Sequence, residues 1–222
     1  MTARRLIVWR HGRTAHNNSK RIQGSTDIPL DATGLAQAEQ SAAILAAHRP
    51  AAIVASDLMR ARATAEALSR LTGIAVTTDP RLRERAFGQW EGLGFEEILQ
   101  RWPLEATAWR HGRDVPEVGM ETRSAAAGRF VTGVITAAEQ VANGGTLVVA
   151  SHGGVIVCGL TALLGLDPVE WLGLRVMGNA RWAVVESADH ASSGWRLASY
   201  DVGPPDTAAD GAPWFGPERG TA

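Results

Sequence analysis

Short apolar runs alternate with amphipathic stretches along most of this chain, and this alternation restricts the possible folds more than any other sequence feature. The runs that predict strands are residues 6–9, 52–55, 74–78, 146–150, 182–186 and 195–200. The stretches that predict helices are residues 34–47, 58–71, 121–141 and 155–164. Strands and helices in this order form a parallel sheet covered by helices. We therefore expect an α/β fold, a three-layer α/β/α sandwich with a mostly parallel central sheet.

Two of the predicted helices follow residues that commonly cap helices. Asp31 or Thr33 precedes the first helix, and Ser56 with Asp57 precedes the second. Side-chain oxygens at such positions accept hydrogen bonds from the first amides of a helix. We therefore expect these residues to begin the two helices.

One domain is expected over residues 1–202, followed by a tail. The chain has 222 residues, a length that fits one domain. Residues 79–119 are expected to form loops and short helices. From residue 203 onward Pro, Gly, Ala and Asp dominate, and such a composition buries little apolar surface. We therefore predict a flexible C-terminal tail at residues 203–222.

Charge and hydropathy argue against two classes of partner. The chain has 22 Lys and Arg against 23 Asp and Glu and a formal net charge of −1. It therefore has no global excess of positive charge for the phosphate backbone of a nucleic acid. No uninterrupted apolar stretch approaches the roughly 18 residues of a transmembrane helix, and the apolar run after Arg5 is too short for a signal peptide. We expect a cytoplasmic protein with no nucleic-acid or membrane partner.

The histidines and the single cysteine do not predict a metal site. His16, His48 and His190 show no ligand-pair spacing, and Cys158 lies in an apolar run. A buried cysteine that packs as a small apolar side chain is the simpler interpretation. We therefore expect neither a metal nor a cofactor.

Basic side chains directly follow two of the predicted strands. Arg10 and His11 follow the first strand, His152 follows the strand at 146–150, and Arg60 lies on a predicted helix. Ligands of such sheets bind at the carboxyl ends of strands. Arginines and Gly-rich turns there favour a phosphate dianion. A histidine among arginines has its protonated form disfavoured, which leaves a ring nitrogen free to attack phosphorus.

Glu84 is the candidate proton donor for the same reaction. It follows the predicted strand at 74–78 and precedes a loop-rich region. A carboxylic acid can protonate a departing alcohol, and as a carboxylate it can activate the water that cleaves a phosphohistidine. One residue is thereby assigned to two steps.

Four sequence runs occur together and in order. They are Leu-Ile-Val-Trp-Arg-His-Gly-Arg-Thr-Ala-His-Asn (6–17), Ser-Asp-Leu-Met-Arg-Ala-Arg-Ala-Thr-Ala (56–65), Leu-Arg-Glu-Arg-Ala-Phe-Gly-Gln-Trp-Glu-Gly (82–92) and Ser-His-Gly-Gly (151–154). With these motifs the chain resembles the histidine phosphatase superfamily, the phosphoglycerate-mutase-like proteins, across roughly residues 4–200. The resemblance implies a phosphoglycerate-mutase-like fold and a phosphohistidine intermediate.

The resemblance also implies roles for individual residues. His11 is then the phosphorylated nucleophile, Glu84 is the proton donor, and the phosphate pocket is formed by Arg10, Arg60 and His152. Four further residues are expected to bind the substrate: Asn17, Gln23, Gly153 through its backbone and, as a weaker candidate, Thr14.

Within this family, hydrolysis is favoured over phosphoglycerate mutation. Mutases carry a longer segment after the glutamate, with a lysine and an arginine pair that hold the carboxylate of phosphoglycerate, whereas residues 85–118 contain no lysine. The run at 177–182 is similar to a branch of the family that acts on glucosyl-3-phosphoglycerate. The expected substrate is a small phosphorylated metabolite, such as a sugar phosphate or glucosyl-3-phosphoglycerate. A mutase and a non-catalytic phospholigand-binding protein are the alternatives, and a homodimer, common in the family, is left open.

The tetrapeptide Arg10–Arg13 is repeated letter for letter at Arg110–Arg113. The second copy lacks the apolar strand that precedes the first, so the backbone that presents His11 is not expected around His111. Contact between this second copy and the non-phosphate part of an acidic substrate is a hypothesis.

Overall fold

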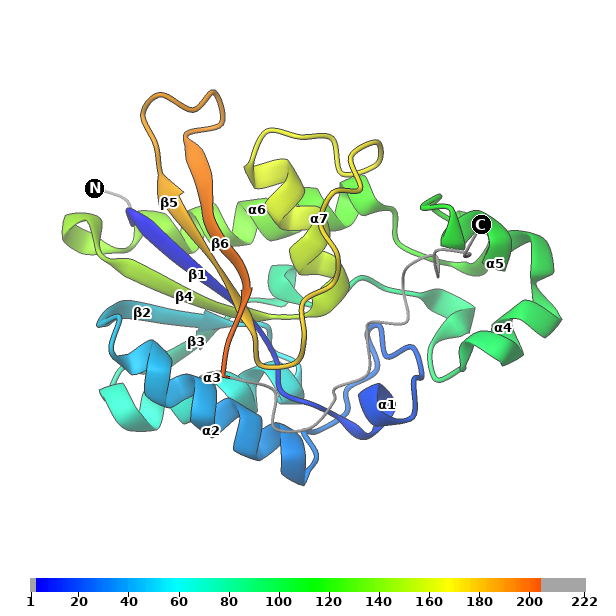
Figure 1. Ribbon diagram of the computed structural model, residues 1–222, viewed down its shortest axis with the longest axis horizontal. Helices are drawn as coiled ribbons and strands as arrows, with labels where there is room; N and C mark the ends of the chain where they lie inside the picture. The colour runs from blue at the N-terminus through cyan, green and yellow to red at the C-terminus, as the bar shows by residue number, and fades with distance from the viewer. Residues whose placement is uncertain (1–2, 205–222) are drawn as a thin grey trace, which may run out of the picture.

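A six-stranded sheet with the order β3-β2-β4-β1-β5-β6 lies at the centre of the computed structural model, in which residues 3–204 are described (Figure 1). The strands are β1 (Arg5–Arg10), β2 (Pro50–Ala55), β3 (Val76–Thr78), β4 (Thr146–Ser151), β5 (Trp182–Ser187) and β6 (Trp195–Val202). The first four are mutually parallel, β5 pairs antiparallel with β1, and β6 pairs antiparallel with β5. The mostly parallel sheet is therefore confirmed, with an antiparallel hairpin at one edge.

Helices cover both faces of this sheet. The helices are α1 (Ala15–Asn18), α2 (Ala32–Ala46), α3 (Met59–Thr72), α4 (Phe95–Arg101), α5 (Pro103–Arg110), α6 (Arg123–Glu139) and α7 (Gly153–Leu163). Short 3-10 helices lie at η1 (Pro80–Leu82), η2 (Gly88–Trp90), η3 (Pro116–Val118) and η4 (Ala142–Gly144). In Figure 1, α2 and α3 cover one face of the sheet, and α6 and α7 cover the other.

Alternate residues of each strand supply the two cores between these layers. In β1, Ile7 and Trp9 pack with α2 and α3, whereas Leu6 and Val8 pack with α6 and α7. Successive side chains of a strand point to opposite faces, and a sheet covered on both faces needs apolar residues in both sets. This explains why the central strands are continuously apolar, and it confirms the predicted sandwich.

The turn after β1 packs directly on the first turn of α2. Asp31 caps α2 as predicted, because its Oδ1 accepts a hydrogen bond from the Gly34 amide at 2.8 Å. A Cβ atom at Gly12 would lie only 2.3 Å from the carbonyl oxygen of Gly34, and a Cβ at Gly34 would lie 2.0 Å from that of Arg13. Only glycine permits this approach of two backbones. The contact fixes the segment that follows β1.

The predicted cap of α3 is wrong. Ser56 and Asp57 precede the helix, but its N-cap residue is Leu58, whose side chain makes no capping hydrogen bond. The carboxylate of Asp27, from a distant loop, instead accepts a hydrogen bond from the Met59 amide at 2.7 Å. The Asp57 carboxylate forms an ion pair with Arg83 at 2.6 Å. A tertiary contact has replaced the local cap.

Residues 79–119 form short helices and loops, as predicted, and build a lobe on the side of the sheet where β1 and β4 end (Figure 1). The lobe has a small core of its own, which includes Trp90, Ile98, Ala106 and Val118. Trp90 and Trp109 pack edge to face, with ring centroids 5.4 Å apart. This core holds the lobe together without any strand.

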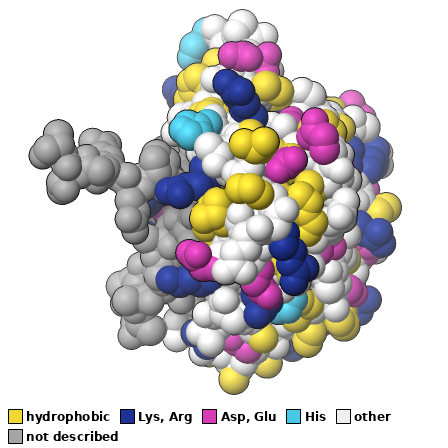
Figure 2. Space-filling view, turned by 90° about the vertical axis from the view of Figure 1, so that its right-hand side faces the viewer, with side chains coloured by type: hydrophobic (Ala, Val, Ile, Leu, Met, Phe, Trp, Pro, Cys, Tyr) yellow, Lys and Arg dark blue, Asp and Glu magenta, His cyan; other side chains and the backbone are white. Residues whose placement is uncertain are grey.

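No helix among residues 3–204 is both long and apolar enough to cross a membrane. The predicted tail falls almost wholly outside the described residues, which end at 204, so its flexibility stays a prediction. Figure 2 shows the face that carries the right-hand side of Figure 1, and basic side chains are interspersed there with acidic and hydrophobic ones.

The packing between α6 and α7 gives a stability prediction. A Cβ at Gly159 would lie 2.1 Å from the ring of the fully buried Phe130. We expect Gly159→Ala to lower the free energy of unfolding by about 1–3 kcal/mol, because overpacking outweighs the helical preference of alanine. The matched control is Gly128→Ala, since a Cβ there would meet nothing within 4 Å. That control should gain about 0.5–1 kcal/mol. Urea denaturation of both variants checks the contrast, which equal effects would contradict.

Candidate active site

The two candidate histidines meet because β1 and β4 are neighbouring parallel strands. Arg10 pairs with Ser151 at their carboxyl ends, and the His11 amide donates to the Ser151 carbonyl at 3.0 Å. The rings of His11 and His152 come to a centroid distance of 5.1 Å. The register of two strands thus unites residues far apart in the chain.

The His11 ring is held in one tautomer. Its Nδ1 lies 2.7 Å from the carbonyl oxygen of Gly12, and because a carbonyl can only accept, Nδ1 must carry the proton. The other nitrogen, Nε2, then keeps its lone pair. The Gly12 backbone is itself fixed, since its amide donates to Thr64 Oγ1 at 3.1 Å. The local backbone therefore leaves the Nε2 lone pair available.

Burial keeps this imidazole neutral. His11 is only 2% exposed, and burial, with the nearby charges of Arg60 and Arg10, holds its pKa well below the ordinary value of 6.5. A positive charge on the ring would have to be desolvated beside two guanidinium groups. His11 is therefore neutral at physiological pH.

Arg60, near the start of α3, is fully buried and held on three sides. Its terminal nitrogens donate to the carbonyls of Thr26 at 2.7 Å and Gly24 at 2.8 Å, and its Nε donates to His152 Nδ1 at 3.1 Å. Burial lowers its pKa to about 10, so the group stays charged at neutral pH. A fixed, desolvated guanidinium is suited to a phosphoryl oxygen.

The hydrogen bond from Arg60 also defines His152. Nδ1 accepts from Arg60, so in the neutral ring the proton lies on Nε2. Burial and the charge of Arg60 hold the pKa of His152 well below 6.5. Nε2 is buried and makes no hydrogen bond within residues 3–204. It is a donor available to a phosphoryl oxygen.

Arg10 completes the group of cations from the end of β1. It donates to the carbonyl of Met177, in the loop before β5. Both His11 and His152 sense its charge, so it lies beside the two rings. The structure therefore brings together all four basic residues predicted to bind or accept a phosphoryl group.

Asn17 has an oriented side-chain amide. Its Oδ1 accepts hydrogen bonds from the Thr14 amide and hydroxyl, both at 3.1 Å, and from Asn179 Nδ2 at 3.2 Å. With the oxygen so occupied, the NH2 group is the part left to face a ligand. Thr14 caps α1, so its hydroxyl is engaged with Asn17. Its predicted contact with substrate stays a prediction, as does that of Asn17.

Gln23 and Gly153, two further residues predicted to bind substrate, are both buried. Gln23 is 8% exposed, and its Oε1 is buried with no hydrogen-bond partner in the described part of the chain. Gly153 is the first residue of α7, and a Cβ there would lie 2.6 Å from Val176 and 3.3 Å from Arg10 Nε. Glycine at this position lets the helix N-terminus approach Arg10.

Glu84 is anchored against the same helix N-terminus. Its Oε1 accepts from the amides of Arg85 at 2.8 Å and Val155 at 2.7 Å, and its Oε2 accepts from the Gly154 amide at 2.9 Å. Glu84 also acts electrostatically on Arg60. The predicted proton donor therefore lies near the basic group, at the N-terminus of α7.

Sequence reasoning missed the residues that hold these groups in place. Asn179 orients Asn17 and also donates to the His11 carbonyl at 3.2 Å. Arg129 binds the Glu84 carbonyl, and Glu121 binds Arg129 and the Ala86 amide. They come from distant segments, and none is next to a catalytic motif in the sequence. Asn179 lies in the run 177–182, which shows only a family likeness in the sequence.

The second Arg-His-Gly-Arg tetrapeptide lies at the end of α5, not after a strand. His111 is exposed, and its Nδ1 contacts the Thr107 carbonyl at 2.8 Å. The structure therefore gives it none of the surroundings of His11. Its contact with a substrate stays a hypothesis.

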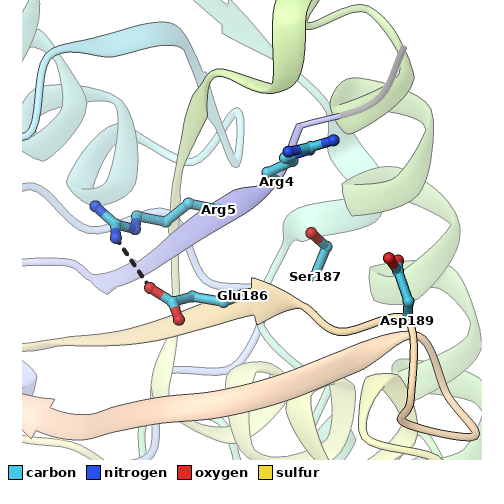
Figure 3. Close-up of a pocket in the computed structure, with 5 residues that line it drawn as sticks. All are labelled: Arg4, Arg5, Glu186, Ser187 and Asp189. Atoms are coloured by element: carbon cyan, nitrogen blue, oxygen red, sulfur yellow. Dashed lines mark hydrogen bonds and ion pairs between the residues drawn. The ribbon is translucent and has the colours of Figure 1, made fainter.

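A cavity lies at the opposite end of the sheet from the histidines. It measures about 370 Å³ and is lined by residues at the start of β1 and the end of β5 (Figure 3). Arg5 and Glu186 form an ion pair there at 2.9 Å.

Within residues 3–204, no three His, Cys, Asp or Glu side chains are grouped to hold a metal ion. That the reaction needs no metal stays a prediction.

The two buried histidines predict how stability depends on pH. Their pKa values are lowered in the folded protein. Below about pH 6.5 these histidines therefore bind protons in the unfolded chain but stay unprotonated in the folded one. Stability must then fall as the pH decreases below about 6.5, by at most about 1.4 kcal/mol per pH unit for each histidine. Urea titrations between pH 7.5 and 5 measure this slope. His11→Gln should remove one histidine's share of it, because His152 and His16, whose pKa values are also lowered, remain. An unchanged slope would contradict the assignment.

The histidine phosphatase superfamily (branch 1) model matches residues 6–201 of this chain. A glucosyl-3-phosphoglycerate phosphatase of Mycobacterium tuberculosis is 37% identical over 91% of this chain and 96% of its own length. A probable phosphoglycerate mutase of Yersinia enterocolitica is 31% identical over 89% of this chain and 90% of its own.

A solved structure of mycobacterial glucosyl-3-phosphoglycerate phosphatase with VO3 superposes with a TM-score of 0.81, at 36% identity, over 90% of this chain and 99% of that one. The motifs, the sheet topology and these likenesses agree. The chain belongs to the histidine phosphatase superfamily.

Proposed function

We propose that this phosphatase hydrolyses a phosphomonoester in two steps, through a phosphohistidine on His11. In the first step Nε2 of His11 forms a bond to phosphorus while the bond from phosphorus to the leaving oxygen breaks. In the second step water forms the new bond, and the bond from phosphorus to nitrogen breaks. The observation that carries the proposal is the Nδ1 contact with the Gly12 carbonyl, which leaves Nε2 unprotonated.

The charge of the transferred group is met by fixed donors. Arg10, Arg60 and Nε2–H of His152 lie around His11 and supply positive charge and N–H groups to the phosphoryl oxygens. These groups are already oriented by protein contacts, so little reorganisation accompanies the reaction. The Asn17 amide and the Gly153 backbone would add further donors.

Glu84 donates a proton in the first step and accepts one in the second. As the carboxylic acid it donates a proton to the leaving oxygen; a proton carried on Oε2 leaves Oε1 as the acceptor for the amides of Arg85 and Val155. As the carboxylate it then takes a proton from the attacking water. The cycle returns both His11 and Glu84 to their starting states.

For the substrate we propose glucosyl-3-phosphoglycerate. This choice is supported by the likeness to phosphatases with that name, over nearly their whole length. The absence of lysine from residues 85–118 argues against a mutase. The cytoplasmic location, the homodimer and the lack of nucleic-acid and membrane partners stay predictions.

A substrate panel tests the activity. We expect phosphate release in the presence of a metal chelator, highest with glucosyl-3-phosphoglycerate, and none above background from His11→Ala. The variant should keep the circular dichroism spectrum of the wild type. Release that needs added metal, or that survives in His11→Ala, would refute the mechanism. Conversion of 3-phosphoglycerate to 2-phosphoglycerate without phosphate release would favour the mutase.

The role of Glu84 can be tested with leaving groups of different basicity. We expect Glu84→Gln to slow hydrolysis of an alkyl phosphate by about 100-fold or more, because an alkoxide needs a proton. Nitrophenyl phosphate, whose leaving group departs as the anion, should lose much less when phosphohistidine formation limits its rate. Single-turnover kinetics measure both losses in that step. Equal losses would count against proton donation.

A further inference from the structure

The segment that carries Glu84 lacks regular secondary structure. After η1, residues 83–87 belong to no helix or strand. Their backbone groups therefore have no ladder or helix to satisfy them, and the position of Glu84 must be set by other contacts. The proton donor of the proposed reaction depends on those contacts.

Arg129, on α6, supplies several of them. One of its terminal nitrogens donates to the carbonyls of Arg81 at 2.8 Å and Arg83 at 2.7 Å, and the other donates to the carbonyl of Glu84 at 3.1 Å. A single guanidinium thus binds the backbone at and before the proton donor.

Glu121 holds this guanidinium in place. Its carboxylate accepts from Arg129 Nε at 2.7 Å and from a terminal nitrogen at 2.8 Å, a two-pronged ion pair. Burial raises the pKa of Glu121, but the hydrogen bonds and charge of Arg129 outweigh it, and the net pKa is lowered. The carboxylate also accepts from the Ala86 amide at 3.2 Å, and the Glu121 amide donates to the Ala86 carbonyl at 2.9 Å.

These contacts use every donor that Arg129 has. A guanidinium carries five N–H groups, and each has an acceptor in the carboxylate of Glu121 or in the three carbonyls. Nothing remains for a phosphoryl oxygen. Arg129 is therefore not part of the phosphate pocket, although it is close enough to add to the positive charge that His152 senses.

Glu84 is consequently held from two sides. Its carbonyl is bound by Arg129, which Glu121 holds, and its carboxylate is bound by the N-terminus of α7. The phosphate pocket is built differently, from strand ends and α3. A change in the pair would move the proton donor and leave His11, Arg60 and His152 in place.

We infer that Glu121 and Arg129 are positioning residues for Glu84, and that they act on proton transfer to the leaving group and not on phosphate binding. The inference rests on the proposed role of Glu84. It predicts that loss of the pair reproduces the kinetic signature of losing Glu84.

The test uses Arg129→Gln and the nearly isosteric Glu121→Gln in the full chain. Single-turnover hydrolysis of an alkyl phosphate should slow at least about 10-fold in each, with a much smaller loss for nitrophenyl phosphate. Inhibition by inorganic phosphate should be unchanged. Arg129→Lys keeps the charge but has too few donors for five acceptors, so it should restore the alkyl rate only partly. It also serves as the second variant should Arg129→Gln unfold.

A double variant separates positioning from general stability. In a Glu84→Gln background, Arg129→Gln should add less than about threefold, because the group that it positions is already gone. The matched control is Arg5→Gln, which removes another arginine–carboxylate pair at the far end of the sheet (Figure 3). It should leave the ratio of alkyl to nitrophenyl rates at the wild-type value.

Two results would overturn the inference. Equal losses on both substrates in the Gln variants would mean a general structural role, and additive losses with Glu84→Gln would mean an independent one. If Glu84→Gln itself shows no dependence on the leaving group, the proposed role of Glu84 fails and the inference fails with it. If it does show that dependence while Arg129→Gln does not, only the positioning role is refuted.

Discussion

The parallel pairing of β1 with β4 is the constraint on which the rest of the site depends. Its register sets Arg10 opposite Ser151, so the residues that follow the two strands share one edge of the sheet. His11 and His152 thereby directly follow strands that are hydrogen-bonded to a neighbour on both sides. A parallel sheet buried on both faces has little freedom to shift its register, because a slip by one residue would exchange the two cores.

Burial and hydrogen bonding determine the protonation state and the tautomer of the two histidines. Both histidines lie beside Arg60, but their Nδ1 atoms make different hydrogen bonds. His11 donates from Nδ1 to a carbonyl, whereas His152 accepts at Nδ1 from a guanidinium. The same type of side chain therefore presents a lone pair in one case and an N–H in the other. Desolvation keeps both rings neutral. Two imidazoles thus present different groups, a lone pair and an N–H, because their hydrogen-bond partners differ.

The stability and the function of this arrangement are linked. Two histidines and an arginine are buried together, and keeping the histidines neutral costs no stability only where solution pH leaves them unprotonated in the unfolded chain too. Glycines at 12, 34 and 153 allow backbones to approach where a Cβ would collide. The Glu121–Arg129 pair then joins the irregular segment of Glu84 to α6. Each device fixes one reacting group without occupying the place where a phosphoryl group would bind.

The order of strands and helices, the mostly parallel sheet and the strand-end location of His11 and His152 were accessible from the sequence alone. Apolar runs and helical periodicity are local, and residues that follow buried strands are likewise identified by their neighbours. The cap of α3 was not accessible, because Asp27 reaches it from another loop while Asp57 pairs with Arg83.

The sequence by itself determined which residue types stand at the strand ends and which family they match. Only the tertiary structure decided which imidazole nitrogen carries the proton, which face of Asn17 is occupied, and that Glu121 and Arg129 hold Glu84. The physical reason is that tautomers, amide orientation and backbone support depend on hydrogen-bond partners from distant segments, and no local pattern records those partners.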